Sequence, residues 1–294
     1  MTTMLDQVRA AVAEITGRAA DDVRRLGGGD TAAAFAVRLD NGETVFAKTA
    51  PATMSGAIEA EAASLAWLAE PGAVAVPALR GHTESWLVTE HVPEAAPSPG
   101  AAERLGRELA ALHAAGAPAF GAAPPGGPAD AWIGLAPMRN EPSGQQWPSF
   151  YARHRVEPYL RRAVDSGTLS AEASAVISRV CAQIDDLAGP AEPPARLHGD
   201  LWSGNVHWGT QRAWLIDPAA HGGHRETDLA MLHLFGCPHL DRVLAAYQEV
   251  SSLADGWRQR IGLHQLFPLL VHTVLFGGGY ASQAVAAARS ALDV

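Results

Sequence analysis

The chain has 294 residues, 48% of them hydrophobic and 18% charged, with a formal net charge of −9 and an isoelectric point near 5.7. This length can bury a sizeable core in one large or two medium domains. The acidic balance argues against nucleic acid or an anionic membrane as the main partner, and no segment looks targeted to or anchored in a membrane, so we expect a cytoplasmic protein.

The first predicted elements are a short helix and a glycine-rich loop. Apolar residues recur at helical spacing between Leu5 and Ile15, which predicts a helix over residues 5–16. The stretch Leu26-Gly27-Gly28-Gly29-Asp30-Thr31 follows. Three glycines let backbone N–H groups approach an anion closely, so this loop is a candidate phosphate-binding site. A glycine triplet is also typical of a flexible turn, and the loop alone does not decide between the two.

A hairpin with a lysine on its second strand comes next. Residues 35–39 and 43–49 are predicted strands joined by an Asp-Asn-Gly turn. Lys48 lies late in the second strand, where a kinase places the cation that holds the α- and β-phosphates, although a solvated strand end has the same pattern. The following helix, with its apolar face from Ile58 to Leu68, offers Glu59 or Glu61 as an ion-pair partner, and we assign Glu61.

Two further strands, residues 74–79 and 86–92, are predicted to lead into a Pro-rich loop. We expect this loop to be the hinge between an N-terminal nucleotide-binding lobe, residues 1–93, and a catalytic and substrate lobe, residues 94–294. Adenine would stack there between apolar side chains and hydrogen-bond to backbone groups of Glu90 and Val92.

The rest of the chain is mostly helical in pattern. Helices are predicted over residues 148–165 and 170–187, after a loop at 117–128 that is rich in Pro and Gly. Cys181 and Cys237 lie in apolar helical stretches, which favours buried small residues over a disulfide. The histidines show no spacing typical of zinc ligands, and His264 and His272 are interpreted as core or interface residues.

The segment with the most chemical information is His198-Gly199-Asp200-Leu201-Trp202-Ser203-Gly204-Asn205, followed by a short hairpin and Ile216-Asp217-Pro218. Asp200 and Asn205 have the D-L-x-x-x-N spacing of a kinase catalytic loop, and Asp217 ends an apolar run where a second metal-binding aspartate belongs. An aspartate can align an attacking hydroxyl and accept its proton, while the amide and carboxylate oxygens suit Mg²⁺. A His-Gly-Asp tripeptide alone would be an ordinary capped turn, but the full set favours a kinase.

In this order, the features resemble the protein-kinase-like superfamily and, within it, the fructosamine kinase (ketosamine 3-kinase) family, which is related to the aminoglycoside phosphotransferases. The stretches that carry the resemblance are residues 197–205, 216–219, 223–231 and 234–236. Trp202 separates the chain from the aminoglycoside enzymes, which usually have another residue there. The resemblance spans nearly the whole chain.

The resemblance implies an α+β, protein-kinase-like fold of two lobes, with an N-terminal antiparallel sheet plus one helix and a mostly helical C-terminal lobe. It implies phosphorylation of the 3-hydroxyl of a ketosamine, dependent on ATP and Mg²⁺, and a role in protein deglycation. Asp200 is then the catalytic base, Asn205 and Asp217 bind Mg²⁺, and Lys48 and Glu61 position the phosphates. Trp202 is expected to pack against the sugar-amine; the alternative is that its side chain packs in the protein core.

The resemblance also implies roles for two supporting residues, and the chain departs from the family pattern at two places. Asp228 is expected to brace the catalytic-loop backbone, and His198 to tie that loop to the segment around Asp217. Asp30 replaces a phosphate-loop cysteine through which relatives form redox-sensitive dimers. His221 and Gly222 replace a frequent tyrosine pair, which makes His221 a candidate substrate contact and leaves the sugar and amine open.

Two other functions compete with the ketosamine kinase. One is a small-molecule kinase of the aminoglycoside or choline type on the same fold, and the other is a pseudokinase that binds nucleotide without transferring phosphate. Keeping Lys48, Asp200, Asn205 and Asp217 together argues against the pseudokinase, since a binding module needs no general base. The expected partner is a free or protein-linked ketosamine, and the expected state is a monomer or weak homodimer.

Overall fold

The computed structural model describes residues 3–27, 33–143 and 146–293. Gly28, Gly29 and Asp30 of the predicted phosphate loop therefore lie outside the described residues, and only Gly27 of that group is described.

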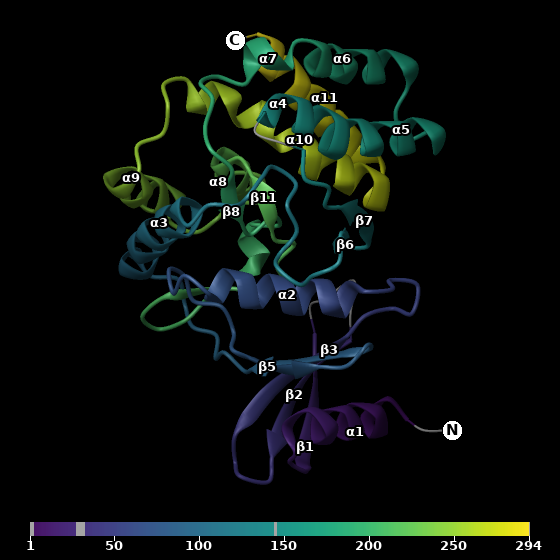
Figure 1. The fold of residues 1–294 in the computed structure, drawn as a ribbon, viewed down its shortest axis with the longest axis vertical. Coiled ribbons are helices and arrows are strands. Elements are labelled where there is room, and N and C mark those ends of the chain that lie inside the picture. The colour runs from purple at the N-terminus through teal and green to yellow at the C-terminus, as the bar shows by residue number, and fades with distance from the viewer. Residues whose placement is uncertain (1–2, 28–32, 144–145, 294) are drawn as a thin grey trace.

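A five-stranded antiparallel sheet, ordered β1-β2-β3-β5-β4, makes up the N-terminal part (Figure 1). Helix α1 packs on one of its faces, where Val8 and Val12 join Phe35, Val45 and Val88 in a single buried cluster. The elements of this part are α1 (Met4–Thr16), β1 (Ala20–Leu26), β2 (Ala33–Leu39), β3 (Thr44–Thr49), α2 (Ala57–Ala69), β4 (Leu79–His82) and β5 (Trp86–Glu90).

Helix α2 lies between the sheet and the helical part of the molecule (Figure 1). Its apolar face is a helical stripe that includes Ile58, Leu65 and Leu68, and these side chains pack in one cluster with Leu105 and Leu229 of the helical part. The buried cluster formed by the sheet and α1 includes no residue of α2. The cluster that contains the apolar face of α2 also includes Leu87 of β5, so α2 packs against both the helical part and the sheet.

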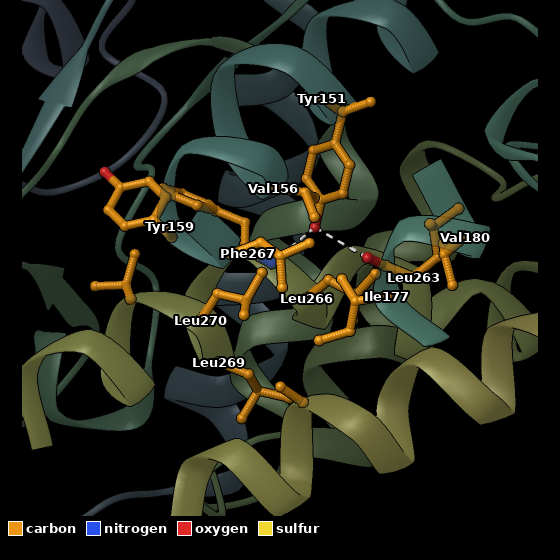
Figure 2. Packing of buried hydrophobic residues seen from close by; sticks show 14 of the residues in the cluster. Tyr151, Val156, Tyr159, Ile177, Val180, Leu263, Leu266, Phe267, Leu269 and Leu270 are labelled. Atoms are coloured by element: carbon orange, nitrogen blue, oxygen red, sulfur yellow. Dashed lines mark hydrogen bonds between the residues drawn. The ribbon is translucent and has the colours of Figure 1, made fainter. Parts of the chain in front are cut away.

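The helical part is built around α10, against which the π-helical turn 151–156, α5, α8 and α11 pack, while α6 packs on α11 and α5 (Figure 1). Figure 2 shows this core, in which the buried Tyr151 hydroxyl donates to the carbonyl of Leu263 and accepts from the N–H of Phe267. The helices are α3 (Pro99–Ala114), α4 (Trp147–Phe150), the π-helix (Tyr151–Val156), α5 (Glu157–Asp165), α6 (Ala171–Ala182), α7 (Ile184–Leu187), α8 (Arg225–Leu232), α9 (Leu240–Val250), α10 (Trp257–Phe276) and α11 (Gly278–Leu292).

Three small antiparallel strand pairs lie between the sheet and the large helices. They are β6 (Asp130–Ile133) with β7 (Ala136–Arg139), β8 (Ala195–Leu197) with β11 (His221–Gly223), and β9 (Val206–Trp208) with β10 (Ala213–Leu215). Strand β8 leads directly into the predicted catalytic loop, and a 3₁₀ turn (Ser203–Asn205) ends that loop. The loop is thus anchored at both ends by paired backbone.

The expected α+β arrangement, with an N-terminal antiparallel sheet and a helical C-terminal part, is confirmed. One strand was placed wrongly. Residues 74–78 are not a strand, and β4 begins only at Leu79. Within this segment the Ala75 carbonyl accepts from the N–H of Leu215 in β10, and Pro77 has no N–H to offer a sheet. The lobe boundary at residue 93 stays a prediction, and among the described residues no helix is long and apolar enough to cross a membrane.

Candidate active site

A cleft of about 440 Å³ lies between α2, the catalytic loop and α10. Six of the predicted site residues line it: Lys48, Glu61, Asp200, Trp202, Asn205 and Asp217. They come from β3, α2, the catalytic loop and the segment after β10. Residues separated by up to 169 positions in the sequence are thus brought to one place.

The buried carboxylate of Asp228 holds the backbone of the catalytic loop. Asp228 is fully buried and accepts hydrogen bonds from the backbone N–H groups of His198, at 2.7 Å, and Gly199, at 3.0 Å. His113 reaches the same carboxylate at 3.3 Å. These bonds hold the pKa of Asp228 below its ordinary value despite its burial, which opposes ionisation. The expected bracing by Asp228 is confirmed.

His198 ties the loop to the metal-ligand segment, as expected. Its ring Nε2 lies 3.0 Å from the Ile216 carbonyl, and its own carbonyl accepts from the N–H of Ala219 at 3.0 Å. Burial lowers the pKa of His198, so the ring is neutral and its Nε2–H can donate to that carbonyl.

Asn205 and Asp200 are joined by two hydrogen bonds. The Asn205 Nδ2 donates to the Asp200 carbonyl at 2.8 Å and to its Oδ2 at 3.1 Å. This fixes the amide so that its Oδ1 points away from Asp200 and is free to bind a cation. Burial and, after it, the nearby charge of Asp217 raise the pKa of Asp200 to about 7, although the Asn205 hydrogen bond opposes both. Asp200 can therefore exchange a proton near neutral pH.

Lys48 bridges two carboxylates. Its Nζ lies 2.7 Å from Oε2 of Glu61 and 2.8 Å from Oδ1 of Asp217. Burial opposes the charge on Lys48, but the two carboxylates outweigh it and raise the Lys48 pKa above its ordinary value. Glu59 is exposed, so the choice of Glu61 for the ion pair is confirmed.

Asp217 adopts a backbone conformation that non-glycine residues rarely use, with φ of 51°. The chain turns sharply after β10 and presents the carboxylate to the cleft, where half of the side chain is exposed. Burial opposes ionisation, yet Lys48 keeps the pKa of Asp217 below its ordinary value. Its Oδ2 has no partner among the described residues, which leaves this oxygen available to a cation.

Of the predicted hinge residues, Glu90 ends β5 and Val92 comes two residues later, and neither is among the residues that line the cleft. The Glu90 N–H is already paired with the Ala78 carbonyl, and the Val92 carbonyl accepts from His207 Nε2 at 3.0 Å. The Val92 N–H has no partner in the described part of the chain, and the Glu90 carbonyl accepts from the Thr89 hydroxyl. The Val92 N–H is therefore free to pair with a base.

Aromatic side chains form a wall that lines part of the same cleft as Lys48. Trp202, Trp132, His272 and Phe276 line it, with Phe235 packed edge-on to Trp202 at 5.8 Å between ring centroids. Trp202 is 36% exposed, so the alternative of a core position is wrong. The sequence interpretation missed His272 and Phe276, although their spacing of four residues on the apolar stretch of α10 puts them on one helix face.

His221 does not line the described cleft. It lies in β11, is 2% exposed, and its Nδ1 is 2.9 Å from the Ala219 carbonyl. The strand pairing with β8 turns its side chain into the protein, and the interpretation of His221 as a substrate contact was therefore wrong.

A second group of titratable side chains lies elsewhere in the helical part. His224, Glu226 and His264 are buried with donor atoms within 4.8 Å of one another, the spacing of a metal site. Arg260, however, donates to both carboxylate oxygens of Glu226, at 2.9 and 2.6 Å. A guanidinium in that position repels a cation and uses its ligand atoms, so we assign this group to the core.

Known proteins are similar to this chain over almost its whole length. The sequence model described as fructosamine kinase matches residues 4–293. A protein of Synechocystis named probable ketoamine kinase is 34% identical over 254 residues, which cover 84% of this chain and 82% of that protein. The crystal structure of a candidate fructosamine-3-kinase from Thermobifida fusca is 49% identical, covers 98% of this chain and 99% of its own, and superposes with a TM-score of 0.92.

The fold also extends beyond that family. A macrolide 2'-phosphotransferase from Brachybacterium faecium has a TM-score of 0.65 at 18% identity, covering 96% of this chain and 97% of its own. At this identity the likeness concerns the fold alone, which is that of a kinase-like phosphotransferase.

Proposed function

Because this chain belongs to the fructosamine kinase family, and is therefore a phosphotransferase that acts on a hydroxyl group, we propose that it transfers the γ-phosphate of ATP to the 3-hydroxyl of a ketosamine. The observation that carries the proposal is the single cleft in which Lys48, Glu61, Asp200, Asn205 and Asp217 meet. This set contains a base, a phosphate-binding cation and oxygen ligands for a metal.

In the proposed reaction, Asp200 aligns the acceptor hydroxyl and takes its proton as the oxygen attacks phosphorus. Its pKa of about 7 suits this step, because the carboxylate is formed at neutral pH and is still basic enough to hold the proton. Lys48, kept charged by Glu61 and Asp217, is placed to hold the α- and β-phosphates.

The oxygen atoms present suit Mg²⁺. Asn205 Oδ1 and Asp217 Oδ2 are both hard donors without partners among the described residues, and they lie in the same cleft. These two residues would hold the ion, which supplies charge neutralisation on the phosphates when bound.

The family relatives support the ketosamine, and the aromatic wall suits it. A flat indole such as that of Trp202 can cover the apolar face of a sugar or lie near a protonated amine. A 3-phosphorylated ketosamine decomposes and frees the amine, so we propose deglycation of lysine side chains or small amines as the purpose. A kinase of the aminoglycoside or choline type remains the competing assignment.

An ADP-release assay on purified protein separates these assignments. We expect turnover with ribulose-lysine, fructose-lysine or erythrulose-lysine and little with choline or aminoglycosides. Phosphorus NMR of the product then shows whether the phosphate is on the 3-oxygen. Turnover with choline or an aminoglycoside alone would replace the proposal, and ADP binding without any turnover would favour the pseudokinase.

A further inference from the structure

The carboxyl end of α2 leaves the Trp67 carbonyl without a backbone partner. In an α-helix the carbonyl of residue i accepts from the N–H of residue i+4, so the Trp67 carbonyl would need a donor at position 71. That residue is Pro71, which has no N–H. The last turn of α2 also contains no basic side chain to offset the negative end of the helix dipole.

Arg196 supplies what α2 lacks. It is 8% exposed, and its Nη1 donates to the Trp67 carbonyl at 2.8 Å and to the Glu70 carboxylate at 2.6 Å. Its guanidinium also lies over the Trp67 ring, 4.7 Å from the centroid. Its Nε approaches the Gly116 carbonyl at 3.4 Å, just beyond the end of α3. A buried cation thus holds the carboxyl ends of two helices.

Arg196 is also the middle residue of β8, four residues before Asp200. One backbone segment therefore leads to the catalytic base while its side chain holds the helix that carries Glu61. Glu61 and Trp67 are six residues apart on α2, about 9 Å along the helix axis. The N–H of Ala220, three residues after Asp217, makes a second tie by donating to the Ser64 hydroxyl at 3.3 Å.

These ties explain why Lys48 can bridge its two partners. Glu61 lies on α2 and Asp217 on the helical part, and the apolar face of α2 packs both with residues of that part and with Leu87 of β5. Arg196 and Ala220 tie the helix that carries Glu61 to the part that carries Asp217, while Lys48 reaches both carboxylates from β3 of the sheet. The distance between Glu61 and Asp217 depends on how α2 is seated.

We propose that Arg196 is a positioning residue for nucleotide binding, acting through α2 to keep Glu61 at the distance from Asp217 that lets Lys48 hold both carboxylates. This inference rests on the proposed function, since only that function connects nucleotide binding to catalysis. It is tested by nucleotide affinity, which does not require turnover.

The test compares Arg196→Met with wild type by calorimetric titration of ADP in the presence of Mg²⁺. We expect an affinity about tenfold lower, the size of effect that follows from losing one charge-assisted hydrogen bond. The KM for ATP should rise by a similar factor, with the KM for ketosamine unchanged. Arg196→Lys keeps the charge and a hydrogen-bond donor but loses the planar guanidinium and its contact with the Trp67 ring. This variant should recover part of the lost ADP affinity.

Arg260→Met is the matched control. Arg260 is as buried as Arg196, at 6% exposure, and its hydrogen bonds go to Glu226 and to the carbonyls of Ala254 and Asp255, none of them on α2. Arg260→Met should lower the melting temperature and leave the affinity for ADP unchanged. If Arg196→Met behaves in the same way, Arg196 has only a general structural role and the proposal is overturned.

A double-mutant cycle with Glu61→Gln tests the route of action. If Arg196 acts through Glu61, the two changes in ADP affinity will be less than additive, whereas additive changes would refute this route. A wild-type protein that binds ADP but phosphorylates no ketosamine would overturn the proposed function alone. In that case the affinity comparison would still decide the role of Arg196.

Discussion

In the proposed reaction, Asp200 is the residue on which the chemistry depends. Its carboxylate is fixed by Asn205 and stands over a backbone loop held by Asp228, so its position does not rely on substrate. We expect Asp200→Asn to bind nucleotide like wild type and to lower kcat by about 100-fold or more, the contribution typical of a general base. ADP titration and a single-turnover assay measure the two quantities separately. Near-normal turnover in this variant would remove Asp200 from the role of base.

The pH dependence of the reaction follows from the same side chain. Burial raises the pKa of Asp200 to about 7 in the folded protein, and only its ionised form can accept a proton. We therefore expect kcat/KM to fall about tenfold per pH unit below pH 7 and to level off above it, since this ratio reports the free enzyme. Rate profiles at constant ionic strength, limited to the pH range where the fold persists, measure this. A flat profile would contradict the assignment.

Trp202 is accessible in the cleft, and this makes a mutational test clean. An indole that is 36% exposed contributes less to folding than a core tryptophan, whose truncation costs about 3–5 kcal/mol. We expect Trp202→His to raise the KM for ketosamines while ATP affinity and melting temperature stay close to wild type. A variant that melts early and keeps its substrate ranking would show that Trp202 only packs against Phe235.

At the residue level, the polar residues of the cleft were predicted, and of its aromatic residues only Trp202 was. Asp200, Asn205 and Asp217 have the spacing expected of residues that serve one phosphoryl-transfer reaction, so the sequence pattern alone indicates them. His272 and Phe276 carry no such constraint and look like any apolar helix face. His221 was misassigned because a strand pairing, visible only in the fold, turns it inward.

At the level of elements, the catalytic loop depends on a glycine. Gly199 has φ of 83°, and a Cβ added there would lie 2.1 Å from the Ala219 carbonyl oxygen, far inside van der Waals contact. We expect Gly199→Ala to displace the loop from the segment after Asp217, with a cost of at least about 1–3 kcal/mol for the strained backbone and a loss of activity larger than that of stability. Thermal unfolding and kcat of the variant give both numbers. Wild-type activity would mean that the loop tolerates the shift.

The short strands show what sequence periodicity can and cannot predict. The hairpin of β2 and β3 was predicted because its turn and its alternation are local. Strand β11 and the pair β6 and β7 have three or four residues each, too few for a period, and were not predicted. Residues 74–77 are apolar because they are buried, with Val74 and Val76 packed in the cluster that includes the helical part, and the same apolar run was mistaken for a strand.

At the level of the whole molecule, the core contains an unusual number of neutral histidines. Burial lowers the pKa of His198, His221, His224 and His264, to about 3 for His221. In the unfolded chain each returns to its ordinary value near 6.5. Below that pH the unfolded state therefore binds protons that the folded state excludes, and stability is lost as the pH falls. Asp200 has the opposite effect on stability. Its pKa is raised in the folded protein, so the folded state binds a proton at a higher pH than the unfolded state does, and stability is gained as the pH falls.

Two variants separate these opposing terms. Because a histidine that stays neutral in the fold costs about 1.4 kcal/mol of stability between pH 7.5 and 5.5, His221→Asn should reduce the acid-induced loss by about that amount. Asp200→Asn removes the opposing term, so its loss of stability over the same range should exceed that of wild type. Urea unfolding at several pH values gives these differences directly. If both variants follow the wild-type curve, neither group has the shifted pKa that its burial predicts.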